Sequence, residues 1–190
     1  NVGKIKEIKA LFASFNFTIL SATGLGLTEP NETENSFIGN AVLKAKAAAL
    51  ASGTASLADD SGLSVAALNG APGVYSARWA GPNRDFNIAI KAVEEAFLKT
   101  QSDDTRAEFI CALALVWPDG HAVCVEGKIQ GALKFPARGT RGFGYDPIFQ
   151  PCGHNISFGE MDPDAKHAIS HRADAFAKLI SRCFIPNNNG

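Results

Sequence analysis

Apolar residues recur at intervals of three and four over residues 4–15, and this spacing predicts an amphipathic helix. The alanine-rich segment 37–51 predicts a second helix, which we expect Gly53 to end. We expect two further helices over residues 85–99 and 171–184. The predicted helices therefore alternate with segments whose apolar residues do not follow helical spacing.

Residues 106–117 are apolar on both of their alternating faces, which predicts a strand in the centre of a sheet. The turn residues 118–120 and the following segment 122–133 predict its hairpin partner. Helices combined with an antiparallel hairpin favour an α/β fold with a mixed rather than a purely parallel sheet. The other expected segments are strands over 17–20 and 56–60, loops over 23–36, 62–82 and 136–147, and a disordered tail over 187–190.

Length and composition are those of one globular domain spanning residues 1–190, because 46% of the residues are hydrophobic and can fill a sizeable core. No apolar run approaches the ~18 residues of a membrane span. The net charge of -1 gives no indication of a nucleic-acid surface. Four cysteines without a CxxC pair, and no visible signal peptide, favour a cytoplasmic protein with reduced thiols. The four histidines form no HExxH motif, so we expect no metal bound by histidine or cysteine.

Two adjacent carboxylates end the predicted strand 56–60. Because side chains alternate along a strand, Asp59 and Asp60 should point to opposite faces. At most one of them then faces a site, and a second metal ligand must come from elsewhere. Carboxylates at the end of a strand, followed by a Ser-Gly turn, are typical of Mg2+ and phosphate chemistry. A polar strand end and a turn without function explain the same residues equally well.

Three other segments carry residues suited to an anionic substrate. Residues 1–4 open a helix, where backbone N–H groups, the helix dipole and Lys4 favour phosphate. Glu32 lies in a polar loop, and Lys44 lies on the helix that follows it. Solvated surface lysines are the plain alternative for both cations. Residues 170–172 place an arginine at a helix start, where the dipole disfavours it, and this is a mild indication of function.

The glycine-rich segment 139–147 is suited to close approach of a ligand. Phe143 and Tyr145 offer rings for stacking on a base, and Asp146 offers an acceptor for its N–H groups. The chain contains neither a full GxGxxG motif nor a P-loop. Neither a dinucleotide-binding fold nor a P-loop nucleotide site is therefore supported.

Five motifs follow one another along essentially the whole chain. They are NVGK at residues 1–4, ADDSGL at 58–63, GAPGVYSAR at 70–78, GFGYDPIF at 142–149 and SHR at 170–172. In this order they resemble the inosine/xanthosine triphosphate pyrophosphatase family. The resemblance implies a Mg2+-dependent enzyme that cleaves ITP, dITP and XTP to the monophosphate and pyrophosphate. It also implies an elongated α/β fold around a long mixed sheet, with a central cleft between two lobes, and a cytosolic homodimer.

The resemblance assigns roles to individual residues. It implies a metal site at Glu32 and Asp60, with Asp60 also accepting the proton during catalysis. The residues that match substrate contacts on the phosphate side are Asn1, Val2, Gly3, Lys4, Lys44 and Ser61. The residues that match the base pocket are Phe143, Gly144, Tyr145, Asp146, Lys166, His171 and Arg172.

Two departures from the family pattern leave alternatives open. The family has a strand immediately before the position of Asn1, and we expect it to lie in residues missing from this sequence, because a sheet tolerates an empty central position poorly. Relatives often carry Glu at the position of Gly39, and its loss would weaken catalysis if that Glu assists metal binding. These features leave open a nucleotide-binding regulatory module with lost or weak turnover. A phosphatase that releases orthophosphate is a third alternative, but no DxD nucleophile motif supports it.

Overall fold

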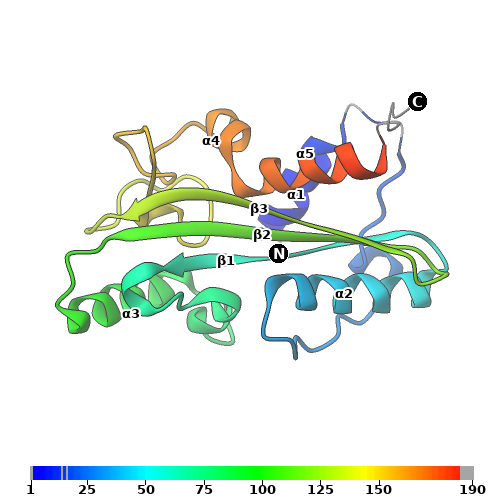
Figure 1. Ribbon diagram of the computed structural model, residues 1–190, viewed down its shortest axis with the longest axis horizontal. Coiled ribbons are helices and arrows are strands. Elements are labelled where there is room, and N and C mark those ends of the chain that lie inside the picture. The colour runs from blue at the N-terminus through cyan, green and yellow to red at the C-terminus, as the bar shows by residue number, and fades with distance from the viewer. Residues whose placement is uncertain (1, 14, 16, 185–190) are drawn as a thin grey trace. The chain divides into compact units, whose positions relative to one another are not determined.

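The computed structural model describes residues 2–13, 15 and 17–184, and Figure 1 shows their helices and strands. The chain forms two compact units. Unit 1 comprises Asn1–Asp60, Cys111–Gly127 and Arg172–Gly190, and unit 2 comprises Ser61–Ile110 and Lys128–His171. The family resemblance implies two lobes, and the structure has two compact units. The central cleft stays a prediction.

One sheet has the strand order β1-β2-β3-β4, with bounds Ser56–Val65, Arg106–Val116, Ala122–Leu133 and Phe149–Pro151. The prediction that β2 is central is confirmed, because β2 lies between β1 and β3 and is buried along most of its length. The hairpin is also confirmed: the Trp117 N–H donates to the His121 carbonyl across the turn. Strand β4 pairs antiparallel with the end of β3. The α/β class predicted from the sequence is therefore correct.

The predicted helices all form, with small shifts at their ends. Their bounds are Val2–Leu11 for α1, Phe37–Ser52 for α2, Phe86–Thr100 for α3 and His171–Cys183 for α5. Helix α2 begins where the Ser36 hydroxyl accepts the Gly39 N–H, and it ends at Gly53, whose φ of 66° is the left-handed conformation that glycine favours. Asp85 caps α3 in the same way, by accepting the Asn87 N–H. A fifth helix, α4 over Pro163–Ile169, was not predicted.

Two predicted features are wrong. No strand forms over residues 17–20, where Phe17 is 50% exposed and Leu20 is 63% exposed. The Phe17 ring instead packs against Phe12 and Phe15. The Ser-Gly turn expected after Asp60 is absent, because β1 continues to Val65.

Strand β1 continues through Gly62 because Ser76 of unit 2 lies directly beside the strand there. The Ser76 hydroxyl accepts the Leu63 N–H at 2.9 Å, and a Cβ at Gly62 would lie 2.3 Å from that hydroxyl. The expected loop therefore begins only after Val65. It contains three short 3-10 helices, Ala66–Leu68, Gly73–Tyr75 and Arg78–Ala80, and two more occur at Thr23–Leu25 and Asp146–Ile148.

Each unit has its own apolar core. The core of unit 1 is formed by Cys111, Leu113, Val125, Ala175, Phe176 and Leu179, against which residues that include Phe12 and Phe15 pack. The core of unit 2 gathers around Phe109, Phe149 and Phe158, whose rings contact one another. Burying one such side chain contributes roughly 1.5–3 kcal/mol. Among the described residues no helix is long and apolar enough to cross a membrane. The tail predicted to be disordered, 187–190, lies outside the described residues.

Candidate active site

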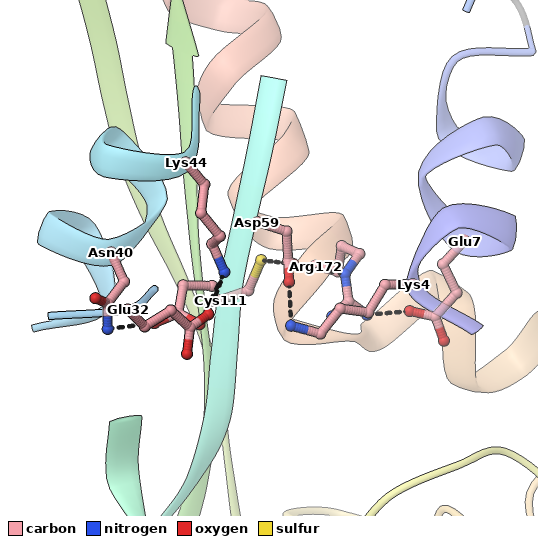
Figure 2. Close-up of polar contacts among 9 residues, drawn as sticks. Lys4, Glu7, Glu32, Asn40, Lys44, Asp59, Cys111 and Arg172 are labelled. Carbon is pink, nitrogen blue, oxygen red and sulfur yellow. Dashed lines mark hydrogen bonds and ion pairs between the residues drawn. The ribbon is translucent and has the colours of Figure 1, made fainter. Parts of the chain in front are cut away.

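Strand β1 presents two neighbouring carboxylates to two different sets of partners in unit 1. Asp59 Oδ1 lies 2.5 Å from Lys4 Nζ, and Asp59 Oδ2 accepts a 3.0 Å hydrogen bond from Arg172 Nε. Asp60 instead lies 3.4 Å from Lys44 Nζ and accepts a 3.2 Å hydrogen bond from the Asn40 amide. Figure 2 shows Lys44 and Lys4 on opposite sides of β1. The predicted divergence of the two aspartates is confirmed.

Lys44 contacts both carboxylates that the family resemblance assigns to a metal. Its Nζ lies 2.6 Å from Glu32 Oε1, closer than to Asp60. Burial alone would lower the pKa of Lys44, but Asp60 and Glu32 outweigh burial and raise it. Burial raises the pKa of Asp60, Lys44 acts against this, and the like charge of Glu32 adds to the rise. The ammonium is thus firmly charged, whereas Asp60 holds a proton more readily than a solvated aspartate.

The donor set around Lys44 fits a divalent cation. Glu32 and Asp60 supply carboxylate oxygens close to one point, and that point already holds a positive charge, the Lys44 ammonium. Mg2+ is commonly bound through one or two carboxylates together with substrate phosphates and water. No group of three or more His, Cys, Asp or Glu side chains suited to a metal occurs in the described part of the chain. Two carboxylates therefore fit a metal that substrate helps to hold, and the metal itself stays a prediction.

Asp59 is the centre of a second buried cluster, which we call the Asp59 cluster: Lys4, Glu7, Asp59, Cys111 and Arg172. The Cys111 thiol donates to Asp59 Oδ2 at 3.0 Å, and Arg172 also pairs with Glu7. Burial alone would raise the pKa of Asp59, but Arg172 and Lys4 hold it well below its usual range. The Arg172 side chain is 1% exposed.

Sequence reasoning missed two members of this cluster. Glu7 follows Lys4 by three residues on α1, so helical spacing already places them on one face. Nothing in the local sequence around Cys111 indicates a polar contact, because it lies in an apolar strand. Arg172, which the resemblance assigns to the base pocket, pairs with Asp59 and Glu7 in unit 1, and its base contact stays a prediction.

Unit 2 contains most of the residues that match a base pocket. Asp146 Oδ2 accepts hydrogen bonds from Lys166 Nζ at 2.6 Å and from the Phe143 N–H at 2.7 Å. Lys166 Nζ also lies 4.6 Å from the centroid of the Phe143 ring. A Cβ at Gly142 would lie 2.0 Å from the Asp146 carboxylate, so glycine permits this close approach. The glycine-rich segment therefore places a partly exposed ring beside a buried ion pair.

Tyr145 differs from the sequence expectation. Its ring is 2% exposed and packs edge-on against Phe86, and its hydroxyl donates to the Ser76 carbonyl at 2.9 Å. Burial raises the pKa of this hydroxyl. Phe143 is less buried than Tyr145, and the stacking role expected of one of the two stays a prediction. His171 is also buried, and its ring stacks on Phe109 at 5.0 Å between centroids.

The remaining predicted site residues lie as follows. Val2, Gly3 and Lys4 belong to the first turn of α1, and Ser61 follows Asp60 directly in β1. Gly144 adopts a φ of 69° within the loop that carries Phe143. Asn1 lies outside the described residues. No finding tests the substrate contacts themselves, which stay predictions.

The amino-acid sequence is similar to those of known proteins over nearly its full length. It is 61% identical to the dITP/XTP pyrophosphatase of Caulobacter vibrioides (strain ATCC 19089 / CIP 103742 / CB 15) over 97% of this chain and 94% of that protein. It is 59% identical to the dITP/XTP pyrophosphatase of Rhodospirillum centenum (strain ATCC 51521 / SW) over 97% of this chain and 91% of that protein.

A solved structure agrees with the sequence comparison. The structure of a HAM1 protein from Coxiella burnetii matches with a TM-score of 0.89 and 38% identity, over 95% of this chain and 93% of that one. The model of the Ham1 family matches residues 1–182. On the evidence of these matches, and of a fold shared with a solved member, the chain belongs to the Ham1 family.

Proposed function

We propose that this protein hydrolyses deaminated purine nucleoside triphosphates, namely ITP, dITP and XTP, to the monophosphate and pyrophosphate, and so removes them from the nucleotide pool. The observation that carries the proposal is identity of about three fifths, over nearly the full chain, to proteins named dITP/XTP pyrophosphatase. The grouping of Glu32, Lys44 and Asp60 supports it with a site chemistry suited to phosphate anhydrides.

We further propose that Glu32 and Asp60 hold Mg2+. When bound, such an ion neutralises phosphate charge and makes water more acidic. Lys44 then binds phosphate oxygens with its N–H donors, and Lys4 binds them from the start of α1. Asp60 accepts a proton from the attacking water. Its raised pKa suits this role, because a base works best when its pKa lies closer to the working pH.

The base is proposed to bind in unit 2, where Phe143 stacks on its ring. Stacking is insensitive to the identity of the base, so selectivity must come from hydrogen bonds. A 6-keto purine presents an acceptor at position 6 and a donor at N1, whereas adenine presents the reverse. Lys166 and Asp146 are a buried donor and acceptor beside the Phe143 ring.

The homodimer is proposed on family resemblance. The exposed ring of Tyr75, 46% accessible and 4.8 Å from the Arg78 guanidinium, suits an interface. Sedimentation at micromolar concentration tests the dimer, and a monomer there would rule it out.

One assay separates the proposed activity from its alternatives. The protein is incubated with ITP and Mg2+, and pyrophosphate and orthophosphate are measured separately. Stoichiometric pyrophosphate and IMP support the proposal, and orthophosphate supports a phosphatase. Binding of ITP without either product supports a regulatory module that has lost turnover. Parallel reactions with ATP and with excess EDTA test the base preference and the need for a metal.

A further inference from the structure

Asp59 is a buried carboxylate that the proposed chemistry leaves without a role. Its side chain is 4% exposed, and it accepts from three donors, Lys4, Cys111 and Arg172. These donors come from three separate elements of unit 1, α1, β2 and α5, and Figure 2 shows them converging on Asp59. A single carboxylate thus fixes side chains that lie far apart in the sequence.

The charges of the Asp59 cluster balance. Two cations, Lys4 and Arg172, face two anions, Asp59 and Glu7. A buried charge is tolerated when it is paired and fully hydrogen-bonded, and loss of one partner leaves the others poorly compensated. Asp59 contacts both cations, with one oxygen for each. Its orientation therefore decides where both cations lie.

Cys111 and Arg172 donate to the same oxygen of Asp59. Arg172 Nε and the Cys111 thiol both donate to Oδ2 at 3.0 Å, which leaves Oδ1 directed to Lys4. The thiol stays protonated, because burial and the Asp59 charge raise its pKa well above the usual value. It is therefore a permanent donor at a fully buried position.

We propose that Asp59 and Cys111 are positioning residues for the substrate: the thiol, together with Arg172, orients Asp59, and Asp59 holds Lys4 for the phosphates. This inference rests on the proposed function, which gives Lys4 that role. Neither positioning residue needs to touch substrate. A long lysine side chain loses considerable rotamer freedom on binding, and fixing it beforehand reduces that loss.

Calorimetric titration with ligands that are not turned over tests the inference. Tripolyphosphate reports on the phosphate contacts, which include Lys4, because it carries no base, and the ratio of the IMP and AMP dissociation constants reports on base recognition. Cys111→Ala removes the donor, and we expect it to weaken tripolyphosphate binding about three- to tenfold and to leave the preference for IMP over AMP unchanged. Cys111→Ser restores a donor at nearly the same place and should recover tripolyphosphate binding. Asp59→Asn should weaken tripolyphosphate binding more strongly, because an amide offers only one acceptor oxygen.

Cys124→Ala in β3 is the matched control for loss of a thiol, and it should leave both readouts unchanged. Melting temperatures are measured in parallel, because a purely structural role would lower stability without changing affinity or base preference. Unchanged tripolyphosphate affinity in folded Cys111→Ala would overturn the inference, as would failure of Cys111→Ser to recover that affinity. The proposed function fails by a different result, absence of pyrophosphate from ITP with the unaltered protein.

Discussion

Asp59 and Asp60 are consecutive residues of β1, and their carboxylates bind different lysines: Asp59 lies 2.5 Å from Lys4 and Asp60 lies 3.4 Å from Lys44. Backbone alternation alone separates them. Their environments also shift their pKa values in opposite directions, downward for Asp59 and upward for Asp60. One strand thus supplies a permanently charged carboxylate and one better suited to exchange a proton.

Replacement of the two aspartates should separate these roles. Asp60→Asn should lower kcat for ITP about 10²- to 10⁴-fold, because it removes the proposed base and one metal ligand. Asp59→Asn should lower kcat much less and should act mainly on KM. Steady-state kinetics with folded proteins checks this prediction, and equal losses of kcat in the two variants would contradict it. Titration with Mg2+ should show weaker metal dependence of ITP binding only in Asp60→Asn.

The phosphate role of Lys44 gives a second prediction. Lys44→Ala should weaken ITP binding about ten- to a hundredfold, which corresponds to the loss of one charge-assisted hydrogen bond. It should weaken IMP binding much less. Lys46→Ala is the control, because Lys46 is exposed on the same helix, α2. Dissociation constants for both nucleotides decide the outcome. A uniform loss for ITP and IMP would show that Lys44 stabilises the fold around Glu32 and Asp60 rather than binding phosphate.

Local patterns predicted the parts of this fold that local forces determine. Strand β2 is apolar on both faces and is central, and α2 has a serine cap and a terminal glycine that are visible in the sequence. The turn expected at Ser61-Gly62 does not form, because the Ser76 hydroxyl, which is distant in the sequence, accepts the Leu63 N–H and the strand continues. Helix α4 was missed although Asp162 and Pro163 form a recognisable helix start.

The members of the candidate site could be named where the family resemblance assigns the residue and not where tertiary packing creates the contact. The resemblance indicated Asp60, Lys44 and Lys166, and the structure places each in a buried ion pair. Cys111 and Glu7 belong to no motif used above, and only the convergence of α1, β2 and α5 reveals them. Tyr145 was expected to contact the base, and its burial in the core against Phe86 could not be read from the sequence.

The structure explains locally why residue 39 is glycine. A Cβ there would lie 2.8 Å from Glu34 Cβ and 2.9 Å from the Ser36 hydroxyl that caps α2. We therefore expect Gly39→Ala to destabilise the protein by about 1–3 kcal/mol through overpacking. In a Glu34→Gly background the same change should cost less, because the nearer obstacle is gone. Urea unfolding of the four proteins measures this coupling, and strictly additive effects would mean that Glu34 does not constrain residue 39.

The buried pair of Lys166 and Asp146 allows stability and base choice to be separated. Lys166→Met leaves the Asp146 charge uncompensated, and we expect it to cost about 3–5 kcal/mol. Adding Asp146→Asn removes that charge and keeps an oxygen to accept the Phe143 N–H, so the double variant should regain most of the stability. It should not regain the preference for ITP over ATP, because the cationic donor proposed to face the 6-keto group is still missing. Thermal unfolding and the ratio of kcat/KM for ITP and ATP measure the two properties independently. A stable double variant that still strongly prefers ITP would show that this pair supports the Phe143 loop and does not distinguish the bases.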